Sequence, residues 1–312
     1  MNNIKVSIIC NTYNHGKYIK DALDGFIMQK TDFEYEILIH DDASTDNTAK
    51  IIREYEKKYP NLVKPVYQNE NQYSQGINII NVFQAPRVNG KYVALCEGDD
   101  YWTDPLKLQK QYDAMEKNVE VDICAHSARK IRESNNKLIS IISPANSIKI
   151  LPLEDIIAGG GGYVATNSLF YRRRLLEERP KFIQYCQLDY ALQIQGGLRG
   201  GMLFLPDCMS IYRALVPGSW TSSMSKKGYN SGQVDKIKKM LDMVNEETNG
   251  EYRKIIDRAK IGVEFSSLEL AGCYKELRKG NMRILYNEQT ILWKIKSYIK
   301  QYFPFLLDLY RK

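Results

Sequence analysis

Residues 92–102, which read YVALCEGDDYW, decide how this sequence is to be folded and where it acts. Tyr92–Cys96 is an apolar run with the length of a buried strand, and Glu97, Asp99 and Asp100 follow it around one glycine. Carboxylates this close repel one another and raise their own pKa values unless a cation compensates. The segment therefore predicts a strand that ends in a cation-binding turn. A solvated acidic turn is the alternative, because Asp and Gly are common turn residues.

The chain before this segment alternates between strands and helices. Strands are predicted at residues 6–10, 35–40 and 62–67, and helices at residues 18–28, 48–59 and 77–85. This alternation is typical of a parallel sheet covered by helices on both faces. In such sheets ligands bind at the carboxyl ends of the strands.

Polar side chains follow the earlier strands in the same way. Asn11 and Tyr13 come after the first strand, and Asp41 and Asp42 come after the second. Acids beside a helix start are also ordinary N-caps, so capping explains part of the second cluster. Two adjacent acids exceed that need, and one carboxylate can accept a hydrogen bond from a base N–H, which selects uracil over cytosine.

The remainder of the chain follows a less regular pattern. A helix is predicted at 106–117, a hairpin at 122–130 and 138–142, a strand at 167–171, a helix at 186–196 and strands at 202–205 and 209–212 around Pro206. Only helical periodicity remains from residue 233. We therefore expect a nucleotide-binding half at residues 1–118, an acceptor-binding half at 119–225 and a helical extension at 226–312.

Composition indicates an ordinary globular protein, because 44% of the 312 residues are hydrophobic and 26% are charged. The net charge of +7 lies mainly in residues 251–312, which hold 13 basic and 7 acidic residues. A basic end favours an anionic surface, either membrane or nucleic acid. No nucleic-acid motif accompanies it, so nucleic acid is not expected as a partner.

The six cysteines and three histidines show no metal-ligand spacing. Free cysteines inside apolar runs indicate a reducing compartment. The sequence enters a strand pattern at once, so no signal peptide is expected. The longest uncharged run, residues 156–171, contains four consecutive glycines and is not expected to span a membrane. A cytoplasmic location is expected.

Three segments resemble the signature segments of family-2 glycosyltransferases, which are inverting enzymes of the GT-A fold. They are Val6–Asn14 (VSIICNTYN), Glu36–Thr48 (EILIHDDASTDNT) and Tyr92–Trp102 (YVALCEGDDYW). The resemblance covers roughly residues 4–225. It implies an α/β fold with a Rossmann-like, mostly parallel central sheet flanked by helices, here followed by a C-terminal helical extension.

The resemblance also implies a UDP-sugar donor held with Mn²⁺ or Mg²⁺. Asp99 and Asp100 are the implied metal ligands, and Glu97 replaces the first aspartate of the family's D-x-D, which leaves the direct ligand open among the three acids. Asp42 corresponds to the acid that contacts uracil. The implied donor-binding residues are Asn11, Tyr13, Asp41, Asp42, Glu97, Asp99 and Arg213.

Asp189 is the implied general base, because similar enzymes place an acid at the start of a short helix in this part of the chain. Its alternative is an exposed helix acid favoured by the helix dipole. Asn167, Ser168 and Trp220 are expected on the acceptor side. Leu215 stands where many members have a histidine, so that contact is missing here or comes from another residue.

The C-terminal segment repeats apolar and aromatic residues at helical spacing from Ile291 to Phe303, with lysines between them, and Phe305–Leu307 and Arg311–Lys312 follow. This pattern predicts a helix lying on an anionic membrane surface. A helix packed on the catalytic core is the alternative.

The combined prediction is an inverting, metal-dependent glycosyltransferase that moves a sugar from a UDP-sugar to a hydroxyl of a lipid-linked or protein-linked glycan. We expect it at the inner face of the cell membrane in surface polysaccharide synthesis. A nucleotidyltransferase is one alternative, although residues 11–17 lack the usual Gly-rich, basic phosphate loop. A non-catalytic, membrane-attached protein that binds sugar nucleotides is the other. The oligomeric state stays open.

Overall fold

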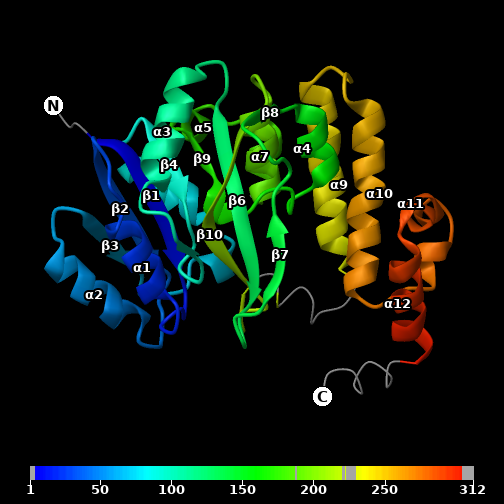
Figure 1. The fold of residues 1–312 in the computed structure, drawn as a ribbon, viewed down its shortest axis with the longest axis horizontal. Coiled ribbons are helices and arrows are strands. Elements are labelled where there is room, and N and C mark those ends of the chain that lie inside the picture. The colour runs from blue at the N-terminus through cyan, green and yellow to red at the C-terminus, as the bar shows by residue number, and fades with distance from the viewer. Residues whose placement is uncertain (1–3, 187, 220–221, 223–229, 304–312) are drawn as a thin grey trace. The chain divides into compact units, whose positions relative to one another are not determined.

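A computed structural model of the chain describes residues 4–186, 188–219, 222 and 230–303 (Figure 1). The chain forms two compact units, residues 1–216 and residues 217–312. The predicted subdivision of the first unit at residue 118 stays a prediction. Trp220 and the segments 305–307 and 311–312 lie outside the described residues.

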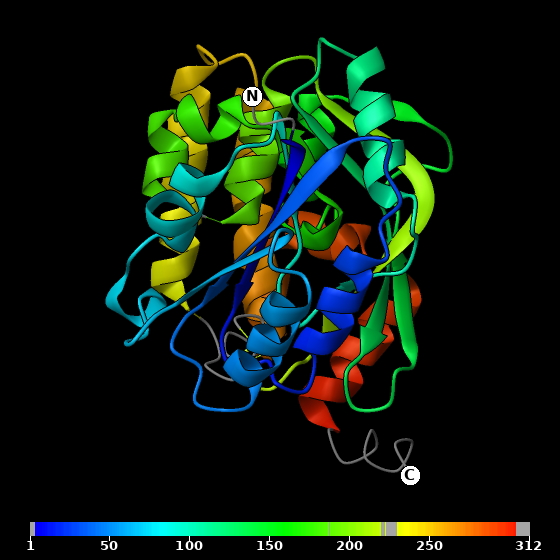
Figure 2. The ribbon, with the colours of Figure 1, turned by 90° about the vertical axis from the view of Figure 1, so that its left-hand side faces the viewer.

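The first half of unit one contains the predicted parallel sheet. Its strands pair in the order β3-β2-β1-β4, all parallel. Figure 2 turns this half toward the viewer, with the blue helices α1 and α2 beside the blue strands. The elements are β1 (Ile4–Thr12), α1 (Ile19–Ile27), β2 (Glu34–Asp41), α2 (Thr48–Lys58), β3 (Val63–Tyr67) and β4 (Tyr92–Leu95).

The second half extends the same sheet with strands of mixed direction. β9 pairs antiparallel with both β4 and β6, and β10 runs parallel to β6. β5 and β8 pair antiparallel with β10, and β7 with β6. The strands are β5 (Tyr101–Trp102), β6 (Ile123–Arg132), β7 (Leu138–Ile142), β8 (Lys149–Leu151), β9 (Phe170–Arg172) and β10 (Met202–Ala214). The helices are α3 (Lys107–Lys117), α4 (Leu153–Gly159), α5 (Arg174–Glu177), α6 (Lys181–Tyr185) and α7 (Asp189–Gly197).

The core of this unit forms where apolar helix faces meet the sheet. α1 buries Ile19, Leu23 and Phe26 completely, because these residues recur at helical spacing. They join Ile8 of β1 and Ile37 of β2 in one cluster. Burial of each such side chain stabilises the fold by roughly 1.5–3 kcal/mol. The core fixes the strands, and with them the positions of the strand ends.

Three predicted elements differ from the structure. The predicted strand at 167–171 is shorter, because Thr166–Ser168 form a 3-10 turn and β9 begins at Phe170. Residues 77–85 do not form a regular helix, because Pro86 lacks an N–H group and restricts the residue before it; Tyr73–Gln75, Ile80–Gln84 and Ala85–Arg87 form short 3-10 and π turns instead. Pro206 does not divide the last strand. β10 runs through it with register shifts after Leu205 and Cys208, because a bulge tolerates a proline without a ladder hydrogen bond.

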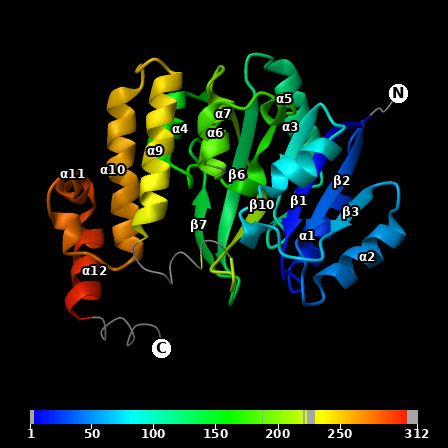
Figure 3. The same ribbon diagram turned by 180° about the vertical axis from the view of Figure 1, so that it is seen from behind.

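The described part of unit two is helical, as predicted from residue 233 onward. Its helices are α9 (Ser231–Glu247), α10 (Arg253–Leu270), α11 (Met282–Glu288) and α12 (Ile291–Tyr302). α9 and α10 lie side by side (Figure 3). A small core around Phe265, Leu277 and Met282 holds α10 and α11 together, and Trp293 of α12 packs on it. Within the described ranges, no helix has the length and apolar content needed to cross a membrane.

Candidate active site

The acidic turn after β4 is tied directly to the end of β1. The Gly98 amide donates to the Asn11 carbonyl at 3.1 Å, and the Asp100 amide donates to the Glu97 carbonyl at 3.1 Å. A Cβ atom at position 98 would lie 2.7 Å from Thr12 Oγ1 and 2.9 Å from His15 Nδ1. Glycine is therefore required here, because the turn passes too close to β1 for any side chain.

Asp100 faces into the protein. Its Oδ1 accepts from the Arg213 amide at 2.7 Å, and its Oδ2 accepts from Asn167 Nδ2 at 3.0 Å. The side chain is buried, and desolvation together with the Asp99 charge raises its pKa well above the usual range. Both oxygens of this predicted metal ligand are thus already bound by the protein.

Asp99 is also largely buried, but its carboxylate lacks such partners among the described residues. Its Oδ2 lies 4.0 Å from His15 Nε2, beyond hydrogen-bond distance, and no other described residue donates to its carboxylate. The carboxylate is therefore open to a ligand. A hard divalent cation fits such oxygens and takes its remaining ligands from phosphate and water. Within the described ranges, no cluster of three or more His, Cys, Asp or Glu side chains is arranged to hold a metal by itself.

Glu97 and Asp189 lie close enough to influence each other. The side chain of Glu97 reaches solvent, and desolvation by surrounding protein, then Asp99, then Asp189, raise its pKa to about 8. Asp189 opens α7 and is half-buried. Desolvation raises the pKa of Asp189, while a hydrogen bond from Thr166 Oγ1 to its Oδ2 opposes that rise. The structure thus brings the predicted general base to the acidic turn; its catalytic role stays a prediction.

The end of β2 repeats the contrast between a bound and an open acid. Asp42 accepts from the backbone amides of Gln72 at 2.7 Å and Tyr73 at 3.0 Å, so its carboxylate anchors the following loop. Asp41 is equally buried, and its Oδ1 has no partner among the described residues. Desolvation raises the pKa of Asp41, while hydrogen bonds from the side chain and backbone of Ser44 to its carboxylate oppose that rise. The oxygen open to a ligand therefore belongs to Asp41, although the resemblance gives the base contact to Asp42.

The side chains of Asn11 and Tyr13 differ in how accessible they are to a bound nucleotide. Asn11 Oδ1 accepts from Gln84 Nε2 at 3.1 Å, which fixes its side chain at the end of β1. Tyr13 is 44% exposed, and Tyr73 of the loop anchored by Asp42 is 63% exposed. Desolvation and then the Glu97 charge raise the pKa of Tyr73, so that ring lies near the acidic turn. Both rings are open for stacking on a nucleotide base.

Arg213 binds groups of its own chain. Its guanidinium donates to the Asp99 carbonyl at 2.8 Å, forms an ion pair with Asp21 and lies 4.4 Å from the centre of the Tyr101 ring. The charge that the resemblance directs to the donor is therefore paired with Asp21, a residue that the sequence analysis did not identify. Leu215 is half exposed, with a positive φ of 67°.

The predicted acceptor residues Asn167 and Ser168 require a correction. Both are fully buried in a 3-10 turn, Thr166–Ser168, because their polar groups satisfy groups of the core. Asn167 donates to Asp100, and its Oδ1 accepts from Ser210 Oγ at 2.7 Å. The side chains of Asn167 and Ser168 therefore do not line an acceptor surface in this structure, and Asn167 positions the acidic turn.

Sequence reasoning also missed His15 and Thr166. His15 Nδ1, Thr12 Oγ1 and Asp41 Oδ1 are buried polar atoms without a partner among the described residues. Unpaired buried polar atoms are costly, so three of them at neighbouring strand ends indicate a place for a polar ligand. The signal for His15 was its position just after β1. No comparable signal marked Thr166.

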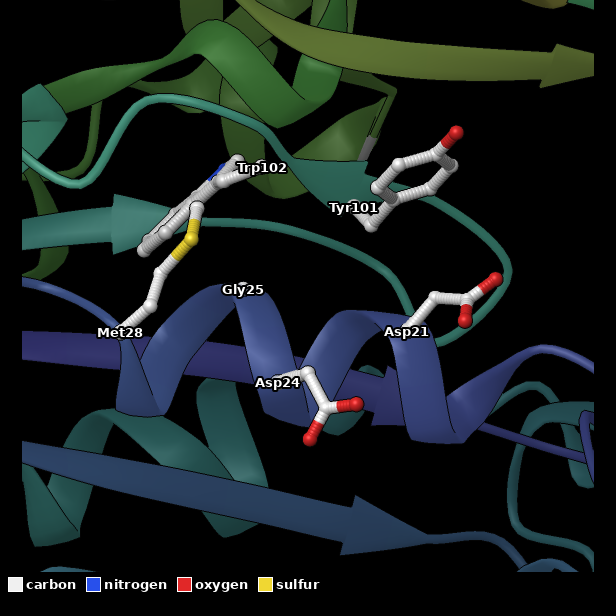
Figure 4. A pocket seen from close by; sticks show the side chains of 6 residues that line it. All are labelled: Asp21, Asp24, Gly25, Met28, Tyr101 and Trp102. Atoms are coloured by element: carbon white, nitrogen blue, oxygen red, sulfur yellow. The ribbon is translucent and has the colours of Figure 1, made fainter.

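A pocket between α1 and β5 is separate from these open acids. Figure 4 shows Asp21 and Asp24 projecting from α1, with Tyr101 and Trp102 of β5 above them. Asp24 is bound by Lys20 at 2.6 Å and by Tyr55, and Asp21 is paired with Arg213. The carboxylates of this pocket are thus already neutralised.

Comparison with known sequences adds a family. Residues 7–180 match the family described as Glycosyl transferase family 2. The uncharacterized protein Rv1520 of Mycobacterium tuberculosis is 37% identical over 246 residues, which are 77% of this chain and 69% of that protein. The putative teichuronic acid biosynthesis glycosyltransferase TuaG of Bacillus subtilis is 34% identical over 110 residues, 35% of this chain and 41% of that protein.

Solved structures share the fold at low sequence identity. S. aureus TarS 1-349 in complex with UDP-GlcNAc aligns with a TM-score of 0.58 and 17% identity, over 96% of this chain and 79% of that chain. The mannosyltransferase PcManGT from Pyrobaculum calidifontis, solved with GDP-Man and Mn²⁺, aligns with a TM-score of 0.57 and 15% identity, over 98% and 83% of the two chains. Another S. aureus TarS structure is covered over 45% of its chain.

Proposed function

Because the chain belongs to glycosyl transferase family 2, we propose that it is an inverting enzyme that moves a sugar from a UDP-sugar to a hydroxyl group of a glycan acceptor. One observation carries the proposal. Glu97, which shares the turn with the open carboxylate of Asp99, is close enough to Asp189 for the Asp189 charge to raise its pKa, after the larger effects of desolvation and Asp99, so a donor held by Glu97 and Asp99 would present its sugar near a carboxylate able to accept a proton.

Asp99, assisted by Glu97, is the candidate ligand for Mn²⁺ or Mg²⁺, and Asp100 keeps the turn in place. When bound, the divalent ion supplies positive charge to the diphosphate of the leaving nucleotide. The open Oδ2 of Asp99 and the absence of a complete protein ligand set among the described residues fit an ion that arrives with the donor.

Asp189 acts as the general base in this proposal. One of its carboxylate oxygens takes the proton of the acceptor hydroxyl while that oxygen attacks the anomeric carbon. The new bond forms on the face of the anomeric carbon opposite its bond to the diphosphate. That older bond breaks, and its electron pair leaves with the diphosphate oxygen of UDP. A single displacement inverts the anomeric carbon. The raised pKa supports the role, because a base with a higher pKa accepts a proton more readily.

The nucleotide base is proposed to be uracil, with Asp41 as the acceptor for its N–H and the exposed Tyr13 beside it. Asp41 Oδ1 is the buried acceptor without a partner among the described residues, whereas both oxygens of Asp42 bind the following loop. The UDP-GlcNAc complex of TarS has the same fold, and the GDP-Man complex of PcManGT makes GDP the necessary competitor in any test.

The acceptor is proposed to be a glycan, carried on a lipid at the inner face of the cell membrane, in the synthesis of a surface polysaccharide. The name of TuaG places that relative in teichuronic acid biosynthesis, and this is the support for a surface glycan. Trp220 stays a proposed acceptor residue. Family membership disfavours a nucleotidyltransferase. A non-catalytic protein that binds sugar nucleotides can be distinguished from the proposed enzyme only by measuring turnover.

Thermal unfolding with nucleotides tests the donor site. UDP with Mn²⁺ or Mg²⁺ should raise the melting temperature more than CDP or ATP does, because uracil N3–H can donate to Asp41 whereas cytosine N3 and adenine N1 carry no hydrogen. UDP should also exceed GDP, which is the decisive competitor because guanine N1–H can donate as well. At a concentration one hundred times Kd, a specific ligand stabilises by about 2.7 kcal/mol. Equal shifts with GDP would contradict the assignment of uracil, and no shift with either metal would contradict the donor site itself.

Turnover is tested with a panel of UDP-sugars. Slow release of UDP from one sugar, raised when glycan acceptors are added, is the expected result. Binding of UDP without hydrolysis or transfer for any sugar would favour the non-catalytic alternative.

A further inference from the structure

Helix α12 is amphipathic, but its polar side faces the protein and its apolar side faces solvent. Its polar residues Ser297 and Gln301 face the protein: Ser297 is 2% exposed, and both the nitrogen and the oxygen of the Gln301 side chain are buried without a partner among the described residues. Trp293 gives the inner side an apolar anchor, packed against Phe265 and bonded to Glu269 at 2.8 Å. A helix placed by its own protein alone would turn its apolar stripe inward.

The outer side of α12 is apolar and aromatic. The hydrophobic side chains on this side remain 43–76% exposed although they are large, so they are not buried against the protein. The rings of Tyr298 and Tyr302 lie 4.6 Å apart, so the aromatic residues form one patch at the end of the helix. The outer face of α12 consists of Ile291, Leu292, Ile295, Tyr298, Tyr302 and the adjoining Phe303.

Lysines border this outer face, and α12 has no acidic residue. Lys296 and Lys300 are exposed, while the Lys294 ammonium donates to the Asn287 carbonyl at 2.8 Å. Around a helix of 3.6 residues per turn, Lys296 falls on one flank of the outer face and Lys294 on the other, whereas Lys300 lies farther round, with its ammonium 5.8 Å from the centre of the Tyr274 ring. The arrangement is an apolar strip between two positive borders.

We propose that the outer face of α12 is a membrane-binding surface for anionic lipid headgroups and the upper part of the acyl layer. The apolar strip would enter the interface, tyrosines would lie at headgroup level, and the lysines would pair with negative phosphate groups. Charge favours this occupant over a second copy, because two copies would bring like-charged borders together. The inference names the contact that the proposed lipid-linked acceptor requires, and to that extent it rests on the proposed function.

Flotation of the full chain with vesicles tests the surface. Vesicles of phosphatidylcholine mixed with phosphatidylglycerol should carry the protein, and vesicles of phosphatidylcholine alone should carry at least about fivefold less, since each lysine near an anionic surface contributes about a fivefold preference. Leu292→Glu with Ile295→Glu should lower binding to the anionic vesicles at least about tenfold. Both positions are exposed, so the fold does not need them.

Matched controls separate the surface from general changes in charge. Val119→Glu with Ile148→Glu changes two equally exposed hydrophobic residues of unit one and should leave vesicle binding unchanged. Lys296→Gln with Lys300→Gln should weaken binding only to the anionic vesicles. Stabilisation by UDP with metal should persist in every variant, so a failed donor site and a failed membrane surface give different results.

Three outcomes would overturn the proposal. One is equal binding to both kinds of vesicle. Another is an equal loss of vesicle binding in the Val119→Glu with Ile148→Glu control. The third is a dimer of the parent chain that Leu292→Glu with Ile295→Glu converts to a monomer, because the outer face would then be covered by a second copy.

Discussion

The ends of β2 and β4 are built alike and differ in their surroundings. Each strand leads into a pair of adjacent acids, Asp41 with Asp42 and Asp99 with Asp100, in which the second acid accepts two protein hydrogen bonds and the first has an open oxygen. In each pair, one acid therefore binds the protein through hydrogen bonds, and the other keeps an oxygen available to a ligand.

The two ends differ in charge. At β4 the open acid shares its surroundings with two further carboxylates, Glu97 and Asp189, whereas at β2 the open acid lies beside Ser44 and is buried. Crowded carboxylates favour a cation or a proton, and one buried carboxylate favours a neutral hydrogen-bond donor. The β4 end therefore suits the chemical step and the β2 end suits recognition of a base.

The largest expected effect comes from removing the proton acceptor at the β4 end. Asp189→Asn should lower kcat by about 10²–10⁴-fold, the usual contribution of a positioned general base. UDP binding should remain nearly intact, because the open acid for the donor is Asp99. Steady-state kinetics and thermal shift with UDP measure the two effects. Loss of both together would assign Asp189 a structural role.

The two acids of the β4 pair should respond differently to the same change. Asp99→Asn should remove the metal-dependent part of UDP stabilisation, with little change in the melting temperature of the free protein. Asp100→Asn should lower the free energy of unfolding by about 1–3 kcal/mol, because one of its two donors would face the Asn amide nitrogen in place of a carboxyl oxygen. Urea unfolding and thermal shift with and without Mn²⁺ provide the measurements. Similar effects of the two variants would contradict the division of roles.

Thr166 offers a subtler test of the same site. Its hydroxyl donates to Asp189 and so opposes the rise in that carboxyl's pKa. In Thr166→Val the pKa of Asp189 should rise further, which moves the acidic limb of the rate profile to higher pH, because the base must be deprotonated to act. At fixed pH below that limb, the rate should fall by about tenfold.

Thr166→Ser is the matched control, since it retains the hydroxyl and should restore the profile. A Thr166→Val variant with lower activity but an unmoved acidic limb would show that Thr166 only supports the fold.

The contrast also marks how far sequence reasoning reaches. Apolar runs set the parallel strands, and polar residues directly after them had to meet at one edge, so the acids at both strand ends were predictable. Which acid is open was not, because the donors come from distant segments. Asp100 is bound by Asn167 and by the Arg213 amide, 67 and 113 residues away.

Burial was the second limit. Asn167 and Ser168 adjoin an apolar run, and polar residues there read equally well as a surface or as a satisfied interior turn. Only the positions of Trp102, Ser210 and Gln111, which bond to that turn, decide between the two. Helical periodicity predicted that α12 has one apolar side. It could not predict that this side, the outer face of α12, is exposed to solvent.

The smallest expected effect is on stability, and the β2 pair should show it with opposite signs. Burial raises the pKa of Asp41, so the folded chain binds that proton more tightly than the unfolded chain. The stabilising contribution of this proton is complete below the ordinary pKa of about 3.9 and is lost as pH rises through the higher folded value. Asp41→Asn removes this loss of stability and should be the more stable variant at neutral pH.

Asp42→Asn should instead lower the free energy of unfolding by about 1 kcal/mol, because one of the amides of Gln72 and Tyr73 loses its carboxylate acceptor. Melting temperatures of the three proteins between pH 4 and pH 8, on the order of a few degrees apart, decide the matter: a parent chain that stays more stable than Asp41→Asn throughout would mean that the hydrogen bonds from Ser44 to Asp41 outweigh the cost of burying its charge.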